Sequence, residues 1–341
     1  MYKTKFEETD IGNTYDMTLL VIRIEERTTK KGDPYCRLTL SDGKIQQETN
    51  LFNNTTKDSL KLQGITEESA VDVRLKCTEY MNQKNFTVDS INPASLSDED
   101  KATLIKMPPV SRKKMLMEMI GTVLDSSGRT YDKETFFIPE DDYSLTALTV
   151  NLISKNSKAF CSSSAAKSMH HNLMGGLLYH SYRMVKAADS ICNVYTNLNR
   201  ELLVCGTALH DIGKIEELST SGLGSASYTA DGRLFGHALI GIEMIDRAVA
   251  EADAKAGKET YNREEVRLLK HLIASHHGIL EWGAIALPAI PEAMVLHNID
   301  MIDSRMYMYE EGTAGTKPGS VSDYINGIAG DGRATIYRPD L

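Results

Sequence analysis

The sequence predicts a multidomain α+β protein in which a small N-terminal β-barrel precedes an all-α domain. Two observations predict this division. Apolar residues alternate with polar ones through much of 14–91, whereas from Ser111 onward they recur at helical spacing. The chain has 341 residues, more than one ordinary domain needs. We therefore expect four parts: a barrel over 1–95, a linker over 96–111, a helical domain over 112–312 and an extended tail over 313–341.

The barrel is predicted from three β-rich blocks. The runs TYDMTLLVIRIEER and PYCRLTLSDGKIQQETNLF carry alternating or β-branched apolar residues, and AVDVRLKCTEYMNQKNFTVDSI repeats the pattern. Turn-forming stretches such as KKGDP, SDG and MNQKN separate roughly five strands. That number of strands, with a short helical or loop insert near 55–66, favours a closed barrel of the oligonucleotide-binding (OB) type over a generic β-sandwich.

The helical domain follows a polar, acidic segment, NPASLSDEDKATLIKMPPVS, whose proline pair marks a domain boundary. Beyond it, runs such as LLYHSYRMVKAADSICNVY, RELLVCGTALHDIGKIEEL and NREEVRLLKHLIASHH have the apolar spacing of helices, and strand-like runs are scarce. The glycine-rich C-terminal residues predict an extended or partly ordered tail.

The apolar stretches, the cysteines and the net charge indicate in which compartment the protein works and what it can bind. No apolar stretch approaches the roughly 20 residues that cross a bilayer, and the start MYKTKFEETD has no apolar core of a secretory signal. The five cysteines form no CxxC pair, which argues against a zinc ribbon or a disulfide framework and fits a reducing compartment. We therefore expect a cytoplasmic protein with no membrane partner. Because the net charge is −9, nucleic-acid binding would depend on local basic patches.

The nine histidines all follow residue 169, within the predicted helical domain. A single histidine on a helix is usually structural, but several histidines and aspartates here lie in apolar runs, where an unpartnered polar group is costly. Convergence on metal explains all of them. Nitrogen and carboxylate ligands without thiolate suit Mn²⁺, Fe²⁺, Co²⁺ or Zn²⁺, and an aspartate can bridge two cations. The residues are His180, His210, Asp211, His237, His276, His277 and Asp300.

The order of these motifs resembles the HD superfamily of metal-dependent phosphohydrolases. The segments SAAKSMHHNLMGGLLYH, LHDIGKIEELS, YTADGRLFGH, HLIASHHG and EWGAIALPAIPEAMVLHNIDMIDSRM, with the N-terminal barrel, resemble the YhaM family of bacterial 3′-to-5′ exoribonucleases. The resemblance extends over about residues 15–310. It departs from the family at Ser164 and Tyr179, where members often carry Pro and Glu, and these departures bear on substrate contacts.

The resemblance implies two divalent ions, Mn²⁺ first and Co²⁺, Fe²⁺ or Zn²⁺ as alternatives. The first ion would be bound by His180, His210, Asp211 and Asp300. Asp211 would bridge to a second ion held by His237 and His276. The main rival to Asp300 is Asp303, which we expect outside the ligand set.

The implied activity is removal of nucleoside 5′-monophosphates from the 3′ end of single-stranded RNA, with single-stranded DNA as a further substrate and a homo-oligomer as the assembly. The two ions would activate water and neutralise charge on the phosphoryl oxygens. The catalytic residues would be Asp211, Lys214 and His277. Lys214 would bind a phosphate oxygen, and His277 would be a further ligand or a proton donor.

Substrate contacts are expected from Lys214, His171, Arg37, Tyr35 and Phe52. Tyr80 and Phe86 are further candidates for base stacking, although aromatic residues serve equally well as barrel core. The basic residues of the barrel would contact the strand or form a solvated face. They include Arg23, Lys30, Lys31 and Lys44.

Three other functions fit parts of the pattern. HD domains also hydrolyse cyclic dinucleotides or nucleotides, and the acidic net charge suits a small substrate. A di-iron oxygenase uses a similar ligand set, but Lys214 and the attached barrel favour phosphate chemistry. A non-catalytic single-strand-binding protein is the third, and the complete ligand set argues against it.

Overall fold

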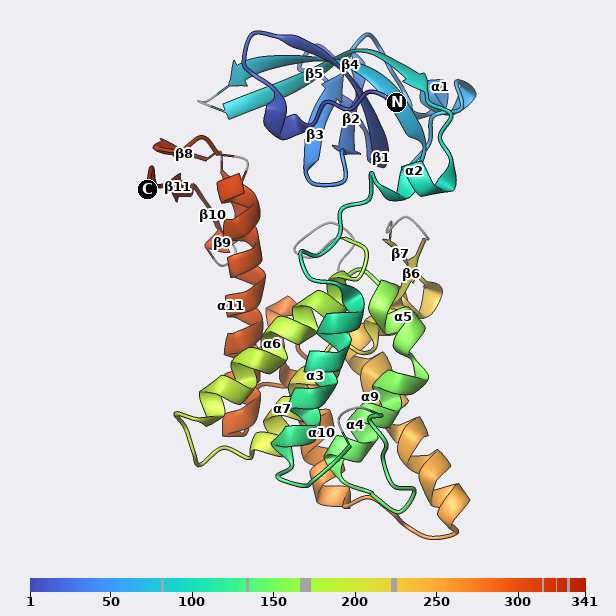
Figure 1. The fold of residues 1–341 in the computed structure, drawn as a ribbon, viewed down its shortest axis with the longest axis vertical. Coiled ribbons are helices and arrows are strands. Elements are labelled where there is room, and N and C mark those ends of the chain that lie inside the picture. The colour runs from blue at the N-terminus through green and yellow to red at the C-terminus, as the bar shows by residue number, and fades with distance from the viewer. Residues whose placement is uncertain are drawn as a thin grey trace. The chain divides into compact units, whose positions relative to one another are not determined.

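The computed structural model describes residues 1–80, 83–132, 135–165, 173–221, 226–314, 316–322, 324–329 and 332–341. The chain forms two compact units, one of Met1–Met107 with Tyr307–Leu341 and one of Pro108–Met306 (Figure 1). The division after Met107 falls within the segment that the sequence marks as a linker. Among the described residues, no helix is both long enough and apolar enough to span a membrane.

The N-terminal unit contains a closed five-stranded barrel with the strand order β1-β2-β3-β5-β4. Adjacent strands of the barrel pair antiparallel, except for β3 and β5, which pair parallel. The helix α1 (Lys57–Leu62) separates β3 from β4. The predicted OB-like barrel and its helical insert are therefore confirmed. The strands are β1 (Thr14–Thr28), β2 (Pro34–Ser41), β3 (Gln46–Leu51), β4 (Ala70–Tyr80) and β5 (Gln83–Pro93).

The barrel interior is filled by alternate aliphatic residues of the strands, such as Leu19, Leu38 and Leu75, which are fully buried. Phe86 on β5 is also buried, and its ring meets that of Phe6 edge-on, with centroids 5.2 Å apart. Phe6 belongs to the 3₁₀ turn η1 (Phe6–Glu8). Phe86 is therefore a core residue, which is one of the two roles that the sequence left open for it, and it is not available for base stacking.

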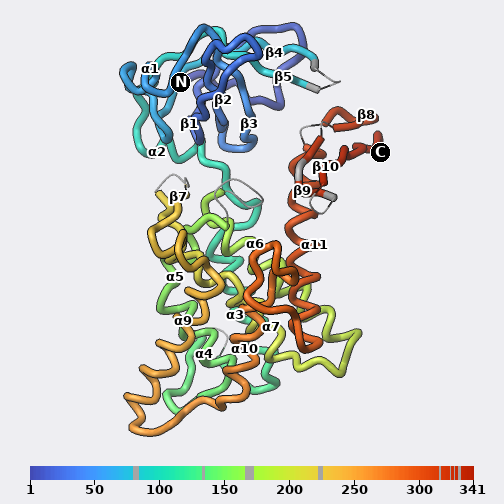
Figure 2. The backbone as a smooth tube through the Cα atoms, turned by 180° about the vertical axis from the view of Figure 1, so that it is seen from behind, coloured from blue at the N-terminus to red at the C-terminus, as the bar shows by residue number. Residues whose placement is uncertain are grey.

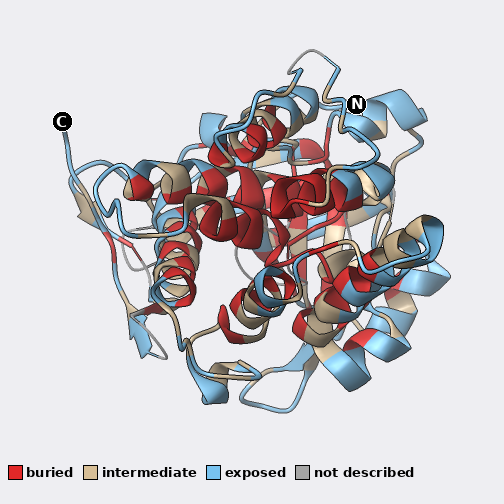
Figure 3. Cartoon of the chain, turned by 90° about the horizontal axis from the view of Figure 1, so that it is seen from below, coloured by how far each residue is buried: buried red, intermediate tan, exposed pale blue. Residues whose placement is uncertain are grey.

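The second unit is built from helices whose buried sides form one core (Figure 3). Most begin at a residue whose side chain accepts a hydrogen bond from a first-turn amide, such as Ser144, Asn199, Thr229 and Asn262. The helices are α3 (Arg112–Ser126), α4 (Leu145–Lys155), α5 (Ser157–Ser162), α6 (Gly176–Cys192), α7 (Arg200–Leu209), α8 (Lys214–Glu217), α9 (Ala230–Ala256), α10 (Arg263–Ser275) and α11 (Pro291–Ala314).

Short elements depart from the simple sequence prediction. A hairpin of β6 (Leu218–Thr220) and β7 (Ala226–Tyr228) interrupts the helical unit between α8 and α9. After α11, the tail that the sequence predicts to be extended or partly ordered contains two small antiparallel strand pairs (Figure 2). The short helix α2 (Asp98–Ala102) lies in the segment that the sequence predicts to be a linker. The 3₁₀ turn η2 (Leu280–Trp282) follows α10. The tail strands are β8 (Ser320–Val321), β9 (Ile325–Ala329), β10 (Gly332–Ala334) and β11 (Tyr337–Arg338).

Candidate metal centre

Five long helices of the second unit bring the predicted metal-binding residues together. His180 lies on α6, and Asp300 lies on α11. His210 and Asp211 directly follow α7, His237 lies within α9, and His276 and His277 directly follow α10. His180, His210, Asp211 and His276 have almost no exposed surface. Residues up to 120 positions apart in the sequence thus form one buried polar cluster.

Two glycines allow this convergence. A Cβ atom on Gly213 would lie 2.0 Å from the carbonyl oxygen of His237 and 2.7 Å from the amide nitrogen of Gly241, so the turn after Asp211 packs directly on the α9 backbone. Gly236 has a φ of 71°, a left-handed conformation that breaks α9 immediately before His237. The helix therefore restarts at His237, beside Asp211.

The first group of ligand atoms surrounds Oδ2 of Asp211. The Nε2 atom of His210 lies 3.2 Å from this oxygen and 3.3 Å from Nε2 of His180. Nε2 of His180 lies 3.3 Å from Oδ1 of Asp300. One ligand atom from each of His180, His210 and Asp211 can be chosen so that all three lie within 4.8 Å of one another.

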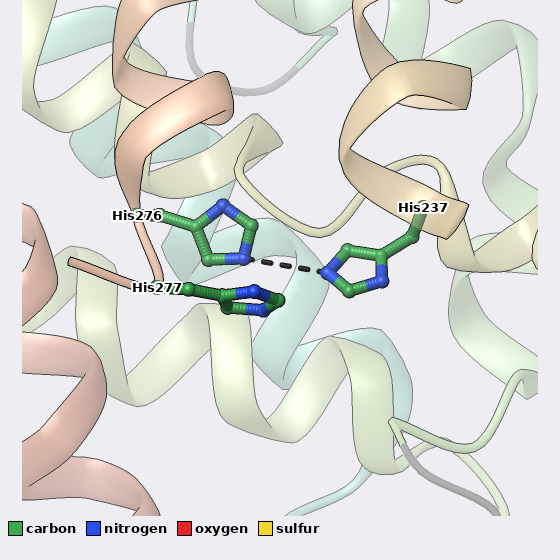
Figure 4. Close-up of side chains that lie close together, drawn as sticks. All are labelled: His237, His276 and His277. Carbon is green, nitrogen blue, oxygen red and sulfur yellow. Dashed lines mark hydrogen bonds between the residues drawn. The ribbon is translucent and has the colours of Figure 1, made fainter. Parts of the chain in front are cut away.

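The second group surrounds the other oxygen of Asp211. Nε2 of His237 lies 3.3 Å from Oδ1 of Asp211, and Nε2 of His276 lies 3.7 Å from the same atom. The two Nε2 atoms are 3.4 Å apart. Figure 4 shows the His237 ring facing the rings of His276 and His277, and ligand atoms of these three histidines also lie within 4.8 Å of one another. Asp211 therefore faces a different set of imidazoles with each oxygen.

The four histidines nearest Asp211 are oriented through their outer ring nitrogens. In the tautomer with a proton on Nδ1, His210 donates to the Thr207 carbonyl at 2.8 Å and His276 donates to the Ile273 carbonyl at 2.7 Å. The other two donate to carboxylates. His180 donates to Asp303 Oδ2 at 2.8 Å, and His237 donates to Glu217 Oε1 at 3.1 Å. This arrangement directs the Nε2 atoms toward the centre, as in metal-binding histidines.

The orphaned atoms of the cluster fit a cation. Oδ1 of Asp211 is buried and has no hydrogen-bond donor among the described residues, and the same holds for Nδ1 of His277. A buried carboxylate oxygen without a partner is strongly unfavourable, and here it faces imidazole nitrogens that carry lone pairs. Oδ2 of Asp211 is paired with Nζ of Lys214 at 2.8 Å. The donor set of imidazoles and carboxylates therefore fits divalent metal.

Electrostatics keep the carboxylates of the cluster ionised. Burial would raise the pKa of Asp211, but Lys214 and His210 hold it well below its usual range. Burial acts likewise on Asp300, whose pKa is held well below its usual range by His180. Burial lowers the pKa of His180, but its hydrogen bonds to Asp300 and Asp303 outweigh this and raise it to about 10. Metal binding at His180 would therefore displace a proton from Nε2.

The pKa values of His276 and His277 are lowered, in contrast to that of His180. Burial and the neighbouring His277 lower the pKa of His276 well below its usual range. Burial and His237 lower the pKa of His277. Burial also lowers the pKa of Lys214, but Asp211 outweighs it, so the net pKa of the ammonium is raised. Lys214 is thus a fixed positive charge beside Asp211.

The predicted substrate residues of the barrel belong to the other unit. The rings of Tyr35 and Phe52 are tilted by 32° with centroids 5.2 Å apart, and Phe52 is 41% exposed. Arg37 forms an ion pair with Glu48 at 3.3 Å, and its Nε donates to Asn50. His171 lies outside the described residues, as does the side chain of Tyr80.

Sequence reasoning missed the supporting carboxylates. Glu217 received no role, and Asp303 was considered only as a rival ligand, whereas it accepts a hydrogen bond from His180 and pairs with Nε of Arg183 at 2.6 Å. The sequence contains a signal for Asp303, because it lies three residues after Asp300 and so shares its helix face. Nothing in the local sequence distinguishes Glu217 from Glu216 beside it.

The helical unit can be classified from these features and from its relatives. The model of the HD domain family matches residues 177–305, which include every histidine and aspartate of the cluster. The second unit is therefore an HD domain, a class that depends on divalent metal, and its His/Asp cluster fits such a site.

Relatives extend the similarity to the whole chain. Three Listeria monocytogenes proteins, each named 3′-5′ exoribonuclease YhaM, are 29% identical to this chain over 331 residues, which is 97% of this chain and 96% of each relative. They come from serotype 4b strains CLIP80459 and F2365 and from serovar 1/2a strain ATCC BAA-679 / EGD-e. The chain is thus similar along nearly its whole length to proteins named YhaM, and it contains an HD domain, as its motifs predicted.

Proposed function

We propose that this protein is a metal-dependent 3′-to-5′ exoribonuclease that acts on single-stranded RNA and releases nucleoside 5′-monophosphates. The observation that carries the proposal is the position of Asp211, whose two oxygens face two separate groups of imidazoles. A carboxylate in this position can bridge the two ions of a hydrolytic site, one with each oxygen. The similarity to proteins named 3′-5′ exoribonuclease along nearly the whole chain supports RNA as the substrate.

We assign the ligands by their position around Asp211. His180, His210, Asp300 and Oδ2 of Asp211 would hold one ion, and His237, His276 and Oδ1 of Asp211 would hold the other. When bound, the two divalent ions activate water for attack on phosphorus and neutralise charge on the phosphate. Mn²⁺ is the proposed ion, with Co²⁺, Fe²⁺ and Zn²⁺ as alternatives that the same donor set accepts.

Two further side chains complete the proposed active site. Lys214 is held by its 2.8 Å ion pair with Asp211, where its ammonium would neutralise charge on a phosphate oxygen. His277 adds a third imidazole beside His237 and His276, and we assign it to the second ion because its ligand atom lies within 4.8 Å of theirs. In the reaction, the bond between phosphorus and the 3′ oxygen of the penultimate nucleotide breaks, and that oxygen gains a proton.

The barrel is proposed to hold the upstream part of the RNA strand. Tyr35 and Phe52 would stack on bases, and Arg37 would contact a phosphate. We further propose that single-stranded DNA is accepted, that the protein works in the cytoplasm, and that it forms a homo-oligomer. Because an aromatic ring can stack on any base, Tyr35 and Phe52 predict that the barrel binds RNA with only modest preference for base sequence.

A substrate panel tests the proposed activity. Linear single-stranded RNA, a circular RNA of the same sequence and a cyclic dinucleotide are each incubated with the protein and Mn²⁺. We expect nucleoside 5′-monophosphates from the linear RNA alone, because an exonuclease needs a free 3′ end. Hydrolysis of the cyclic dinucleotide with intact linear RNA would overturn the proposal in favour of a small-substrate phosphodiesterase. Cleavage of the circular RNA would show an endonuclease instead.

A further inference from the structure

Glu217 occupies a position in the site that the ligand assignment leaves unexplained. It ends α8 and is 7% exposed. One oxygen, Oε1, accepts two hydrogen bonds from the same residue: the backbone N–H of His237 and its ring Nδ1–H, each at 3.1 Å. His237 follows the break at Gly236, so its amide is at the start of a new helical segment, where Oε1 of Glu217 serves as its acceptor.

The backbone of Glu217 is fixed as firmly as its side chain. Its carbonyl oxygen accepts hydrogen bonds from the amide of Thr229 at 2.9 Å and from the Thr229 hydroxyl at 3.2 Å. A Cβ atom on Gly232 would lie 2.3 Å from this carbonyl oxygen, so the first turn of α9 packs directly against it. Glu217 therefore joins α8 to both segments of α9, on either side of Gly236.

The two carboxylates that support histidines differ in charge environment. Asp303, which supports His180, is paired with the guanidinium of Arg183. Among the described residues, no lysine or arginine forms an ion pair with Glu217. The proposed first ion has the carboxylate of Asp300 in addition to Asp211, whereas the proposed second ion has one oxygen of Asp211 and imidazoles. The second half is therefore poorer in negative charge among its ligands.

We propose that Glu217 is a positioning residue for the second ion: it holds His237 in the metal-binding orientation and supplies negative charge to that half of the centre. The inference rests on the proposed two-ion site. A carboxylate that accepts the outer N–H of an imidazole fixes its tautomer and increases the basicity of the other nitrogen. Removing the charge should therefore weaken the second ion and leave the first ion, supported by Asp303, unchanged.

The test compares Glu217→Gln with Glu216→Gln. Glutamine keeps a carbonyl oxygen that can accept both hydrogen bonds but removes the charge. Glu216 is the matched control because it is adjacent, largely exposed and paired with Arg247 at 2.7 Å, away from the histidines. Glu217→Ala, which also removes the acceptor, is the second variant. Mn²⁺ binding to each full-length protein is measured by equilibrium dialysis with elemental analysis, and folding is monitored by thermal unfolding.

We expect wild type and Glu216→Gln to bind two ions with the same affinities. In Glu217→Gln the second ion should bind about 10- to 100-fold more weakly while the first is unchanged, and Glu217→Ala should weaken it at least as much. Raised Mn²⁺ should restore RNA cleavage by Glu217→Gln. Two ions with wild-type affinities in Glu217→Gln, or equal weakening of both ions, would overturn the role of Glu217. A wild-type protein that binds fewer than two ions would instead overturn the two-ion site itself.

Discussion

Two regions of the molecule differ in whether their polar groups already have partners: the proposed metal centre of the HD domain and the aromatic-basic surface of the barrel, formed by Tyr35, Arg37 and Phe52. In the cluster, Oδ1 of Asp211 is buried and has no hydrogen-bond donor in the part of the chain that the structure describes, and the four histidines nearest Asp211 are each held by an outer hydrogen bond. On the barrel, Arg37 is already paired with Glu48, and Phe52 is 41% exposed. In one region the donor atoms converge on positions that suit cations, and in the other the arginine is already paired with a carboxylate.

This difference predicts where substitutions act. A buried centre transmits small displacements to every ligand, because its packing leaves little room for adjustment. An exposed surface contributes contact by contact, and each contact is screened by solvent and salt. We therefore expect larger effects at the metal centre than on the barrel.

The largest effect is expected from Gly213→Ala. Its Cβ would lie 2.0 Å from the His237 carbonyl oxygen, so the turn that carries Asp211 must move away from α9. We expect loss of both ions and a decrease of about 3 kcal/mol in the free energy of unfolding, measured by metal analysis and denaturant unfolding. Gly121→Ala on α3, with nothing within 4 Å of the new Cβ, is the control and should raise stability slightly. Two bound ions in Gly213→Ala would contradict the packing argument.

A smaller effect at the same centre is expected from His277→Gln. If His277 supports the second ion, the rate of RNA cleavage should fall about a hundredfold at limiting Mn²⁺ and recover as Mn²⁺ is raised. His271→Gln is the matched control, because His271 lies on α10 and accepts a hydrogen bond from the Ala289 amide outside the cluster. A rate loss that excess Mn²⁺ fails to restore, with two ions bound, would show that His277 is a proton donor instead.

On the barrel, Phe52→Ala and Tyr35→Ala should each weaken RNA binding. Base stacking on an aromatic ring contributes about 1–3 kcal/mol per base, or roughly 5- to 150-fold in affinity. Fluorescence anisotropy with labelled single-stranded RNA, measured in an Asp211→Asn background that prevents cleavage, gives the affinity. Tyr2→Ala serves as the control, because Tyr2 is a 49% exposed aromatic residue outside the predicted surface. Unchanged affinity in both variants would remove this surface from the account.

The smallest effect is expected at the Arg37–Glu48 ion pair. Arg37→Ala should lower the slope of log affinity against log salt concentration by about 0.7, the value for one phosphate contact with single-stranded nucleic acid. Glu48→Gln should increase affinity, because it frees the arginine from its 3.3 Å partner. A salt titration of RNA binding measures both. Decreased affinity in Glu48→Gln would indicate that Arg37 acts only through its ion pair within the barrel.

The fold and the polar cluster could be predicted because their signals are local. Alternating residues in β1 and β2 and helical spacing in α6 and α10 reflect one buried face each. His210 and Asp211 stand out because they interrupt a run of residues that are all buried in α7. A polar residue in such a run needs a partner, and this holds whichever segment supplies it.

The rest depends on contacts between distant segments. Phe86 alternates in phase with the buried Val88, but an aromatic residue serves base stacking or the core equally well, and only the folded barrel places its ring against Phe6 in the core. Glu217 and Glu216 are neighbours of the same type, and only the packing of α8 on α9 directs one to His237 and the other to Arg247. The hairpin β6–β7 has three residues per strand, too few for a recognisable alternation.

Whether the proposed metal centre removes nucleotides from the 3′ end of RNA can be determined by digesting 5′-labelled single-stranded RNA with the protein and Mn²⁺. Wild-type protein and Asp211→Asn are compared over time, with bound metal determined in the wild-type protein. We predict a descending ladder of labelled products with wild type and intact RNA with Asp211→Asn. Intact RNA with metal-loaded wild-type protein, or an equal ladder with Asp211→Asn, would contradict the account.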